Sequence, residues 1–454
     1  MPHNSRLAIV LAAGLGTRMK SERPKVMHEV ANLSLVGHVL KAVTGAGIDR
    51  VAVVVGPDMP ELAAEVARLA PEAGCHVQGE RLGTAHAARA AAPAFADTPD
   101  QVLVLFGDTP LVSAHTLARV SARLESGADV AVLGFHAADP TGYGRLLTQD
   151  GRLVAIREER DASAEERKVD FCNSGIMGFS GARFAEILGQ VGNANTKGEY
   201  YLTDAVEIAN SMGLSVVTET AEEWEVQGIN TRAQLARVEA DFQARARLAA
   251  MEEGASLVAP ETVFFSHDTR LGRDVLVEPN VVFGPGVTVG DGVTIRAFSH
   301  LEEAVVEAGA TLGPYARLRP GARIGEGAHV GNFVEIKNAR IEAGAKVNHL
   351  TYIGDARVGA KANVGAGTIT CNYDGFLKHH TDIGAGVFVG SNSTLVAPLT
   401  IGDGAYLAAG GVVTEDVPAD ALSLGRSRQV IKEGRGEQLR ARFARAKAEK
   451  QGGK

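Results

Sequence analysis

Glycine and basic residues gather near the start of the chain, where Leu11-Ala-Ala-Gly-Leu-Gly-Thr-Arg-Met19 is followed by Arg23-Pro-Lys-Val26. A glycine-rich loop directly after a buried strand can bring backbone N–H groups close to a phosphate. Arg18 and Lys25 would add positive charge there. The loop lacks the third glycine of the dinucleotide fingerprint, and no Gly-Lys-Ser/Thr follows as in a Walker loop. Taken alone, the run is a candidate phosphate site with an ordinary turn as the alternative.

A second group of polar residues lies between positions 317 and 380. It comprises Arg317-Leu-Arg-Pro-Gly321, Asn332-Phe-Val-Glu-Ile-Lys337, Val347-Asn-His-Leu-Thr-Tyr-Ile353 and the insert Cys371-Asn-Tyr-Asp-Gly-Phe-Leu-Lys-His-His380. A single exposed histidine is usually a plain surface residue, but His349 stands between an arginine pair and a polar insert. A site around His349 and a simple surface position are therefore equally good interpretations.

The elements around the first group alternate strand-like and helical patterns. Buried strands are predicted at Leu7–Ala13, Arg50–Val55, Gln101–Phe106 and Asp129–Phe135, and helices at Ser34–Ala46, Met59–Ala70, Gly83–Ala92 and Ala114–Ser126. This alternation predicts a Rossmann-like α/β domain with a mainly parallel sheet. Ligands of such sheets bind at the carboxyl ends of the strands, which is where the glycine-rich run lies.

The elements around the second group follow a period of six. From Phe283 to Val413 an aliphatic residue recurs every six positions and is usually followed by glycine, as in Ile324-Gly325 and Ile401-Gly402. Six is neither the helical period nor the simple strand period, and hexapeptide repetition is typical of a parallel β-helix. Each hexad would supply one short strand and one corner, with the aliphatic side chain inside the prism.

The repeat is interrupted near the polar group. Three steps take five residues instead of six: Leu301 to Val306, Ile336 to Ile341 and Ile353 to Val358. The insert Cys371–His380 also falls between two hexads. A solenoid needs no such breaks, so they mark a functional site or reflect neutral drift in the corners. His349 comes two residues after the inward Val347, near a corner, so its side chain should project from the prism.

Size and composition indicate a soluble protein of more than one domain. A chain of 454 residues is too long for one core. The net charge of −8 argues against a general role on nucleic acid or at a membrane surface. No apolar run in the sequence is long enough to span a membrane, and the N-terminal apolar run is too short and too promptly polar to be expected to act as a secretory signal. Three widely spaced cysteines, Cys75, Cys172 and Cys371, indicate reduced thiols and a cytoplasmic location.

Two further segments set the expected domain limits. Thr231 to Glu252 is rich in helix formers and lacks glycine and proline, so it is predicted to be one long helix. The segment from Arg426 to Lys454 is basic, and Glu437 to Lys450 within it has a helical pattern. We expect an α/β domain at 1–230, a linker helix at 231–252, and a β-helix domain with a C-terminal tail at 253–454.

The glycine-rich run also resembles the signature of sugar-nucleotide pyrophosphorylases. The similar segments, in the family's order, are Gly14-Leu-Gly-Thr-Arg-Met19 with Pro24-Lys25, Gln78 with Leu82-Gly-Thr84, Phe106-Gly-Asp108, and Glu225-Val-Gln-Gly-Ile-Asn230. Within that family, Gly142-Tyr-Gly-Arg145, Glu158 and Cys172-Asn-Ser-Gly175 resemble the sugar-recognition positions of N-acetylglucosamine-1-phosphate uridyltransferases. The resemblance implies attack of a sugar-1-phosphate oxygen on the α-phosphate of UTP, with release of pyrophosphate.

This resemblance also implies roles for single residues. Asp108, which on its own could be an ordinary turn residue, would hold Mg²⁺ together with Asn230. Lys25 would be catalytic, stabilising the α-phosphate in the transition state, with Arg18 on the leaving pyrophosphate. Gln78, Gly83 and Thr84 would read the uracil. The remaining nucleotide- and sugar-binding positions would be Leu11, Ala12, Ala13, Gly14, Gly144, Glu158 and Asn173, with Asn230 counted among them as well.

The second half resembles the acetyltransferase half of a bifunctional family that joins this uridyltransferase to a glucosamine-1-phosphate acetyltransferase. The segments are Gly331-Asn-Phe-Val-Glu335, Asn348-His-Leu-Thr-Tyr-Ile-Gly-Asp355 and Gly365-Ala-Gly-Thr-Ile-Thr-Cys-Asn-Tyr-Asp-Gly375, so the resemblance covers nearly the full chain. It implies a left-handed β-helix. His349 would be the general base that deprotonates the C2 amine as it attacks acetyl-CoA. The implied sugar-phosphate ligands are Arg319, Lys337, Tyr352 and Asn363, and the implied acetyl-CoA ligands are Ala366, Asn372, Tyr373, Ser391, Ala409 and Arg426.

Two other interpretations remain beside this two-site enzyme: a nucleotidyltransferase for another sugar whose β-helix only assembles subunits, and a passive scaffold. A single prism face is too open to bury the pantetheine of CoA, so a threefold homotrimer with sites between subunits is expected. No nucleic-acid or membrane partner is expected. Cys371 is predicted to pack and not to act as a nucleophile, because no base stands at a motif spacing from it.

Overall fold

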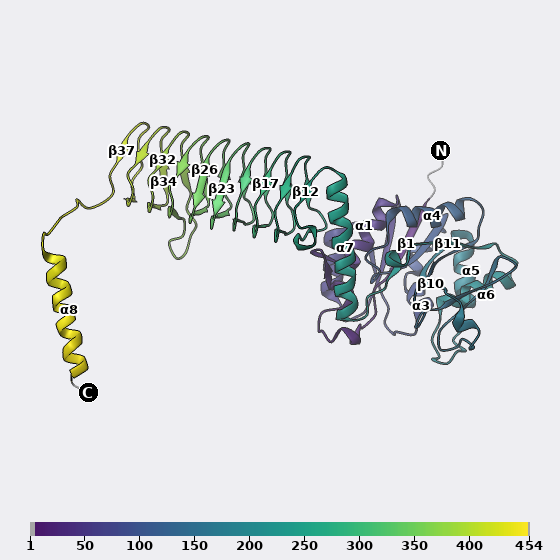
Figure 1. Ribbon diagram of the computed structural model, residues 1–454. Helices are drawn as coiled ribbons and strands as arrows, with labels where there is room; N and C mark the ends of the chain where they lie inside the picture. The colour runs from purple at the N-terminus through teal and green to yellow at the C-terminus, as the bar shows by residue number, and fades with distance from the viewer. Residues whose placement is uncertain (1–4, 453–454) are drawn as a thin grey trace. The chain divides into compact units, whose positions relative to one another are not determined.

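The computed structural model describes residues 5–452, and the contacts divide the chain into two compact units (Figure 1). The first unit runs to Glu252 and also includes Phe264–Thr269. The second unit contains Glu253–Val263 and continues from Arg270. No helix in the described residues is long and apolar enough to cross a membrane.

The first unit is built on a nine-stranded, mainly parallel sheet whose main path runs in the order β11-β7-β10-β6-β1-β4-β5. Its strands are β1 Arg6–Leu11, β4 Arg50–Val55, β5 Gly74–Val77, β6 Gln101–Phe106, β7 Val130–His136, β8 Arg145–Gln149, β9 Arg152–Arg157, β10 Phe171–Ser180 and β11 Val216–Thr220. Strand β10 is antiparallel to both β6 and β7, and β8 with β9 forms an antiparallel hairpin that joins the sheet at β10. The four predicted strands are present to within two residues.

Helices cover both faces of this sheet. They are α1 Leu35–Gly45, α2 Pro60–Leu69, α3 Thr84–Ala90, α4 Ala114–Glu125, α5 Gly181–Gln190, α6 Ala205–Ser211 and α7 Arg232–Glu252. Because side chains alternate along a strand, Val10 of β1 packs with α1, α2 and α4, whereas Ile9 packs with α3, α5 and α6. The predicted helices are thereby confirmed, and the strands read as continuous apolar runs because both of their faces are buried.

The glycine-rich loop after β1 begins at the point where the strand order of the sheet reverses. Strand β1 lies between β4 and β6, so the two halves of the sheet diverge from its carboxyl end. The expected strand stops at Leu11, two residues early, and the loop then forms two 3₁₀ turns, Thr17–Met19 and Lys25–Met27. The backbone N–H of Gly107, after β6, donates to the carbonyl oxygen of Leu11 at 3.0 Å. The Asp108 segment is thus held beside the glycine-rich loop.

Helix α7 closes one side of the first unit and fixes the short segment Phe264–Thr269 against it. The buried side chain of Gln243 donates to the carbonyl oxygen of Phe265 at 2.7 Å and accepts from the Phe265 N–H at 2.8 Å. The N–H of His267 donates to Ala31, in the two-residue turn of the hairpin β2 Glu29–Val30 and β3 Leu33–Ser34. Ala31 and Asn32 both have positive φ, as a two-residue hairpin turn requires, and asparagine tolerates this left-handed conformation.

The second unit is a parallel β-helix with three faces, which we call A, B and C in chain order. Face A holds β12 Ser256–Leu257, β14 Leu276–Val277, β17 Thr294–Ile295, β20 Thr311–Leu312, β23 His329–Asn332, β26 Lys346–His349, β29 Asn363–Val364, β32 Phe388–Val389, β35 Tyr406–Leu407 and β37 Leu422–Ser423. Face B holds β15 Val282–Phe283, β18 His300–Leu301, β21 Arg317–Leu318, β24 Glu335–Lys337, β27 Tyr352–Gly354, β30 Ile369–Cys371, β33 Thr394–Val396 and β36 Val412–Val413. Face C holds β13 Arg270–Leu271, β16 Thr288–Val289, β19 Val305–Val306, β22 Arg323–Ile324, β25 Arg340–Ile341, β28 Ala356–Val358, β31 Thr381–Ile383 and β34 Leu399–Ile401.

The hexad aliphatics fill the interior of these coils. On face B, Leu318, Ile336 and Ile353 occupy the same position in successive strands and are fully buried. Each short strand pairs with the equivalent strand of the next coil, which satisfies its backbone without long strands. The predicted architecture, a Rossmann-like α/β domain with a mainly parallel sheet followed by a parallel β-helix of hexapeptide repeats, is confirmed. The basic tail ends in α8 Arg435–Gly452, where a helix was expected at 437–450.

The breaks in the repeat all fall on one edge of the prism. The three five-residue steps run from β18 to β19, from β24 to β25 and from β27 to β28, and the insert Cys371–His380 connects β30 to β31. Each of these is a passage from face B to face C. His349 ends β26 and lies at the passage from face A to face B. The breaks bracket His349 in the sequence, but they lie on a different edge of the prism.

Candidate functional sites

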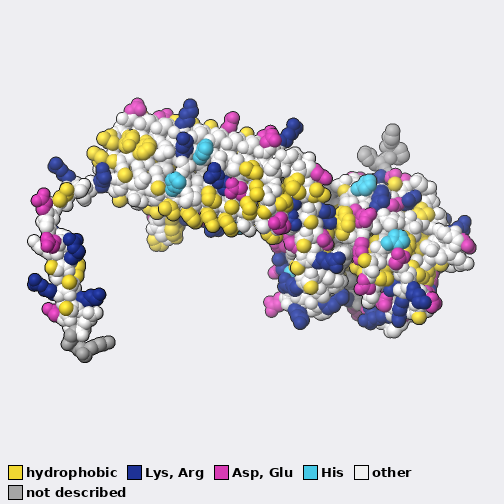
Figure 2. All heavy atoms as spheres, viewed as in Figure 1, with side chains coloured by type: hydrophobic (Ala, Val, Ile, Leu, Met, Phe, Trp, Pro, Cys, Tyr) yellow, Lys and Arg dark blue, Asp and Glu magenta, His cyan; other side chains and the backbone are white. Residues whose placement is uncertain are grey.

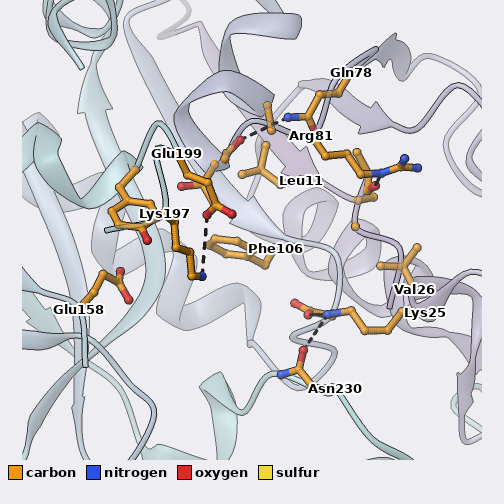
Figure 3. A pocket seen from close by; sticks show the side chains of 18 residues that line it. Leu11, Lys25, Val26, Gln78, Arg81, Phe106, Glu158, Lys197, Glu199 and Asn230 are labelled. Atoms are coloured by element: carbon orange, nitrogen blue, oxygen red, sulfur yellow. Dashed lines mark hydrogen bonds and ion pairs between the residues drawn. The ribbon is translucent and has the colours of Figure 1, made fainter. Parts of the chain in front are cut away.

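The first site is a pocket of about 460 Å³ at the carboxyl edge of the sheet in the first unit (Figure 3). It brings together eleven of the predicted residues, from five separate stretches of the chain. They are Leu11, Ala12, Ala13, Gly14, Lys25, Gln78, Gly83, Thr84, Asp108, Glu158 and Asn230. Arg18, Gly144 and Asn173 are not on the pocket wall. Arg18 contacts the wall residue Asn230, Gly144 lies beside the wall residue Glu158, and Asn173 is hydrogen-bonded to Gly144.

A cluster of positively charged side chains and side-chain oxygens forms one end of the pocket. The ammonium of Lys25 makes an ion pair with the Asp108 carboxylate and donates to Oδ1 of Asn230 at 3.1 Å (Figure 3). Nη2 of Arg18 donates to the same Asn230 oxygen at 2.8 Å. Asn230 is brought there by its neighbour Ile229, whose N–H donates to the carbonyl of Asp108. The Asp108 and Asn230 oxygens thus converge on one positively charged point.

Glycine is required where Lys25 crosses the loop. A Cβ on Gly16 would lie 2.5 Å from Cβ of Lys25, and Gly16 has a φ of +62°. A larger residue would both strain the backbone and push the lysine away. The second glycine of the Gly-x-Gly run, Gly16, therefore has a local physical reason, which is the close passage of the lysine.

Three predicted sugar-binding residues meet at the other side of the pocket. The N–H of Asn173 donates to the carbonyl of Gly144 at 2.8 Å, and a Cβ on Gly144 would stand 3.6 Å from Oε1 of Glu158. Burial raises the pKa of Glu158, an effect that the nearby Lys197 ammonium opposes. Thr203 donates weakly to the same carboxylate at 3.5 Å. The partly buried Glu158 carboxylate is therefore suited to accept hydrogen bonds from hydroxyl or amide groups of a ligand.

Several pocket residues were not found from the sequence. They are Val26, Arg81, Ala87, Phe106, Lys197, Glu199 and Tyr201. Nε of Arg81 donates to the carbonyl of Ala13 at 2.7 Å, and its Nη2 donates to Asp58 at 2.8 Å. Arg81 thus links the glycine-rich loop to the loop between β4 and α2. Arg81 stands inside the segment Gln78–Thr84 and could have been noticed there. Lys197 and Glu199 lie in a loop whose sequence carries no comparable signal.

The second site centres on His349, at the edge between faces A and B. Nδ1 of His349 lies 2.6 Å from Oδ1 of Asn332, one coil earlier. An amide oxygen only accepts, so Nδ1 must carry the proton and Nε2 must have a free lone pair. The imidazole is exposed, as expected, beside a small hollow of about 180 Å³. It is therefore a histidine in the tautomer that a general base needs.

A column of small residues continues from His349 along the same edge. Val347, Val364, Val389 and Leu407 are register partners in successive strands of face A. The residues two positions after them are His349, Ala366, Ser391 and Ala409, which therefore stack on consecutive coils. Backbone hydrogen bonds join the coils here, for example from Asn392 to Ala366 at 2.7 Å. Small side chains leave room along this edge for a long, narrow ligand.

Polar side chains on face B and its far edge hold one another in place. Nη1 of Arg319 donates to Glu335 at 2.9 Å, and Lys337 donates to Asp355 at 3.2 Å. Asn338 and Asn372 also donate to the Asp355 carboxylate. Burial acts to raise the pKa of Asp355, but these hydrogen bonds together outweigh it, and the pKa lies below its ordinary value. Neither Glu335 nor Asp355 was among the predicted site residues.

The remaining predicted residues lie further apart. Tyr352 and Asn372 meet over Gly354, where a Cβ would contact both side chains. Asn363 lies on face A. Tyr373 is exposed on the insert, where its hydroxyl donates to Gly375. Arg426 lies in the exposed segment after β37 and makes no side-chain hydrogen bond or ion pair with the described residues. One copy of the chain thus gathers only part of the expected acetyl-CoA site.

Together the pocket and the β-helix edge define a two-part transferase, in which a nucleotidyltransferase unit is joined to a hexapeptide-repeat acyltransferase. Comparison with known families agrees with both parts. Residues 8–168 match the model of the MobA-like NTP transferase domain. Residues 268–302 and 303–338 match the bacterial transferase hexapeptide model, which describes six repeats.

Comparison with curated proteins identifies the particular family. The chain is 62% identical to the bifunctional protein GlmU of Azorhizobium caulinodans over 441 residues, which cover 97% of this chain and 98% of the relative. It is 60% identical to that of Xanthobacter autotrophicus, covering 98% of this chain and 100% of the relative, and 58% identical over the full length of both chains to that of a Chelativorans species. The chain belongs to the family of bifunctional GlmU proteins. The prediction of a bifunctional transferase is confirmed.

Proposed function

We propose that the chain makes UDP-N-acetylglucosamine by two transfers, one in each unit. The β-helix acetylates glucosamine 1-phosphate with acetyl-CoA, and the α/β unit then transfers a uridylyl group from UTP to the N-acetylglucosamine 1-phosphate. The observation that carries this proposal is the convergence of the uridyltransferase motifs, distant in sequence, on a single pocket. Family membership of the whole chain supports the pairing of the two activities. We place the enzyme in the cytoplasm, in keeping with its three free cysteines.

In the uridylyl transfer, the chain positions two phosphate-bearing substrates and neutralises charge. The backbone at Ala12–Gly14 and the Lys25 ammonium face the α-phosphate, and Arg18 takes the leaving pyrophosphate. A phosphate oxygen of the sugar phosphate forms the new P–O bond as the bond to pyrophosphate breaks, so no side-chain nucleophile is needed. Glu158, Gly144 and Asn173 orient the sugar. Asp108 and Asn230 offer the hard oxygen pair that suits Mg²⁺, which when bound would supply further charge neutralisation.

In the acetyl transfer, Nε2 of His349 takes a proton from the C2 amine. The amine nitrogen forms a bond to the thioester carbonyl carbon, the C–S bond breaks, and the CoA thiol leaves. Arg319, Lys337, Tyr352 and Asn363 bind the sugar phosphate. The small residues Ala366, Ser391 and Ala409 line the CoA path, with Asn372, Tyr373 and Arg426 completing it. Because these last residues are dispersed in one copy, the working form is a homotrimer with each site built between subunits.

The test is an omission assay with glucosamine 1-phosphate, acetyl-CoA, UTP and Mg²⁺, following thiol and pyrophosphate release. Thiol release should need only the first two, and pyrophosphate release should need all four. Supplying N-acetylglucosamine 1-phosphate should remove the need for acetyl-CoA. Pyrophosphate release with an unrelated sugar phosphate and no thiol release would show instead a nucleotidyltransferase whose β-helix only assembles subunits.

Two variants separate the sites. His349→Ala should abolish acetyl transfer and leave uridylyl transfer intact, because Nε2 is the base. Lys25→Ala should do the reverse. Lys168→Ala, which removes a surface lysine paired with Glu165, is the matched control and should leave both rates unchanged. Near-normal uridylyl transfer by Lys25→Ala would contradict the role given to the lysine.

A further inference from the structure

The side chain of Gln78 is buried at the inner wall of the nucleotide pocket and is held by two acceptors. Its Nε2 donates to the carbonyl oxygen of Gly83 at 3.3 Å and lies 3.2 Å from Nδ1 of His86. Figure 3 shows its amide nitrogen turned toward the wall. Only 4% of the residue is exposed, so the amide has little freedom. His86 is not part of the proposed machinery.

The orientation of this amide follows from its partners. A backbone carbonyl only accepts, so the group facing Gly83 must be the NH₂ and not the oxygen. The second amide hydrogen is then directed at His86, whose Nδ1 must accept and whose proton must sit on Nε2. Among the described residues, Oε1 of Gln78 accepts no hydrogen bond, and it is not sealed in the protein. It is the one polar atom of the side chain left for a ligand in the pocket.

The position of His86 is itself rigid. It lies in the first turn of α3, whose start is pinned by the N–H of Ala85 donating to Tyr200 at 2.9 Å and by Thr84 accepting from the N–H of Leu202. The rings of His86 and Tyr200 are in contact, with centroids 6.2 Å apart. Gly83 has a φ of +115°, and a Cβ there would lie 2.5 Å from the Tyr200 carbonyl oxygen. The two groups that hold Gln78 are therefore fixed by the same segment.

We propose that His86 is a positioning residue that sets the base specificity of the pocket. By fixing the amide of Gln78, it presents Oε1 to the base and selects a pyrimidine whose N3 carries a hydrogen. Uracil donates N3–H to Oε1, whereas the N3 of cytosine is an acceptor and would face another acceptor. This inference rests on the proposed uridylyl transfer and names the group that makes it specific for UTP.

Discrimination of this kind depends on preventing the amide from turning over. A free glutamine could present either its oxygen or its NH₂ and would accept both bases. With His86 in place, a turned amide would set its oxygen against the Gly83 carbonyl and would require His86 to move its proton from Nε2 to Nδ1. A buried acceptor that faces another acceptor without a donor is costly. Sites built to pair a substrate N–H reject the analogue that lacks it far more strongly than apolar pockets reject a change in shape.

The test compares kcat/KM for UTP and CTP in the full-length protein. His86→Phe keeps a ring beside Tyr200 but removes the acceptor, and the preference for UTP over CTP should fall about tenfold, the worth of one hydrogen bond. His86→Asn places an acceptor near the former Nδ1 and should keep most of the preference. His115→Phe, on the exposed side of α4, makes the same change away from the pocket and should keep all of it. An unchanged ratio in folded His86→Phe would overturn the inference.

Two further measurements keep the outcome clear. Calorimetric binding of UTP and CTP needs no sugar substrate, so a UTP preference that depends on His86 would stand even if the proposed sugar were wrong. A wild-type protein that binds both equally would refute the inference. Neutron diffraction from the unaltered protein should show deuterium on Nε2 and none on Nδ1 of His86, and the opposite tautomer would also refute it.

Discussion

In both sites a polar side chain with no direct part in the chemistry fixes the one that acts. Asn332 sets the tautomer of His349, His86 sets the amide of Gln78, and Asp355 gathers Lys337 and Asn372. Each of these supports is a neutral amide, an imidazole or a carboxylate whose hydrogen-bonding capacity is largely used inside the protein. Their removal should change activity more than stability.

Asp355 offers the sharpest test of such support. Asp355→Asn keeps the shape of the side chain but removes the charge that holds the Lys337 ammonium. We expect kcat/KM for glucosamine 1-phosphate in acetyl transfer to fall about ten- to hundredfold, since a hydrogen bond to a charged group contributes about 1.5–3 kcal/mol. Uridylyl transfer by the same sample should be unchanged and reports that the first unit is folded. Equal losses in both assays would mean a general folding defect.

The two shifted carboxylates predict opposite pH effects on stability. The pKa of Glu158 is raised by burial, so the folded state holds this proton more tightly than the unfolded state does. Glu158 therefore adds to the free energy of unfolding at pH values below its ordinary pKa of 4.5. This contribution is lost as the pH rises through the raised pKa of the folded state. Asp355 has a lowered pKa, so its contribution is present above 3.8 and is lost as the pH falls through the lowered value.

Glu158→Gln should therefore unfold at a higher temperature than the wild type at neutral pH, because it buries no charge. The difference should shrink as the pH is lowered toward 4.5 and then vanish, since the wild-type carboxyl is then protonated. Calorimetric melting temperatures across this range would measure it. Glu165→Gln, on the surface, should show no such trend. A constant difference at all pH values would contradict the burial argument.

At the level of elements, the sequence predicts what depends on local patterns. Strands β1, β4, β6 and β7 are apolar runs between helices, and the β-helix follows from its hexads. Strand β10 was missed because Asn173-Ser-Gly175 interrupts its apolar pattern, and the register indeed shifts between Asn173 and Met177. Its antiparallel direction also depends on the path of the chain and not on composition.

Among the site residues, too, those in local sequence motifs were predicted and those defined by contacts between distant positions were not. Motif residues such as Lys25, Asp108 and His349 were singled out, but their supports were not, because contacts between coils link residues far apart in the chain. Asn332 lies 17 positions before His349, and Lys337 lies 18 before Asp355. One coil has this length, so a search at that spacing would have found both supports. His86 and Arg81 could not be identified by spacing, because their roles depend on side-chain orientations that the sequence does not give.

Close contact between coils gives a prediction at this scale. A Cβ on Gly331 would lie 2.0 Å from the carbonyl oxygen of Asn348, and backbone cannot yield as a flexible side chain can. Gly331→Ala should displace Asn332 and His349 together and lower acetyl transfer about a hundredfold, the usual effect of misplacing a catalytic group by about 1 Å.

Gly292→Ala is the matched control for this change. It adds a Cβ to open space at a φ of +65°, so it should cost about 1 kcal/mol in strain without reaching the site. Steady-state acetyl transfer rates and urea unfolding of both variants would separate the two effects. Equal rates in the two variants would show that the coil contact does not position the histidine.

For the whole molecule, the surface of the second unit supports the proposed trimer. Phe298, Tyr315 and Phe333 form a stacked ladder on successive coils, with ring centroids 4.9 Å apart, and Leu350 continues the series. All four are exposed by 45% or more. Figure 2 shows hydrophobic side chains gathered along one long edge of the coils. Contiguous apolar surface of this kind marks an interaction site, and Leu350 adjoins His349.

If the ladder packs between copies of the chain, a charge in its middle should separate them. Tyr315→Glu would bury a carboxylate without a partner, so light scattering should show a smaller species than the trimer proposed for the wild type. Acetyl transfer should fall with the loss of the shared site, while uridylyl transfer continues. Thr288→Glu, an exposed position on face C, adds the same charge elsewhere and should preserve the trimer. A Tyr315→Glu trimer with full acetyl transfer would place the interface on another face, and a fully active wild-type monomer would exclude shared sites altogether.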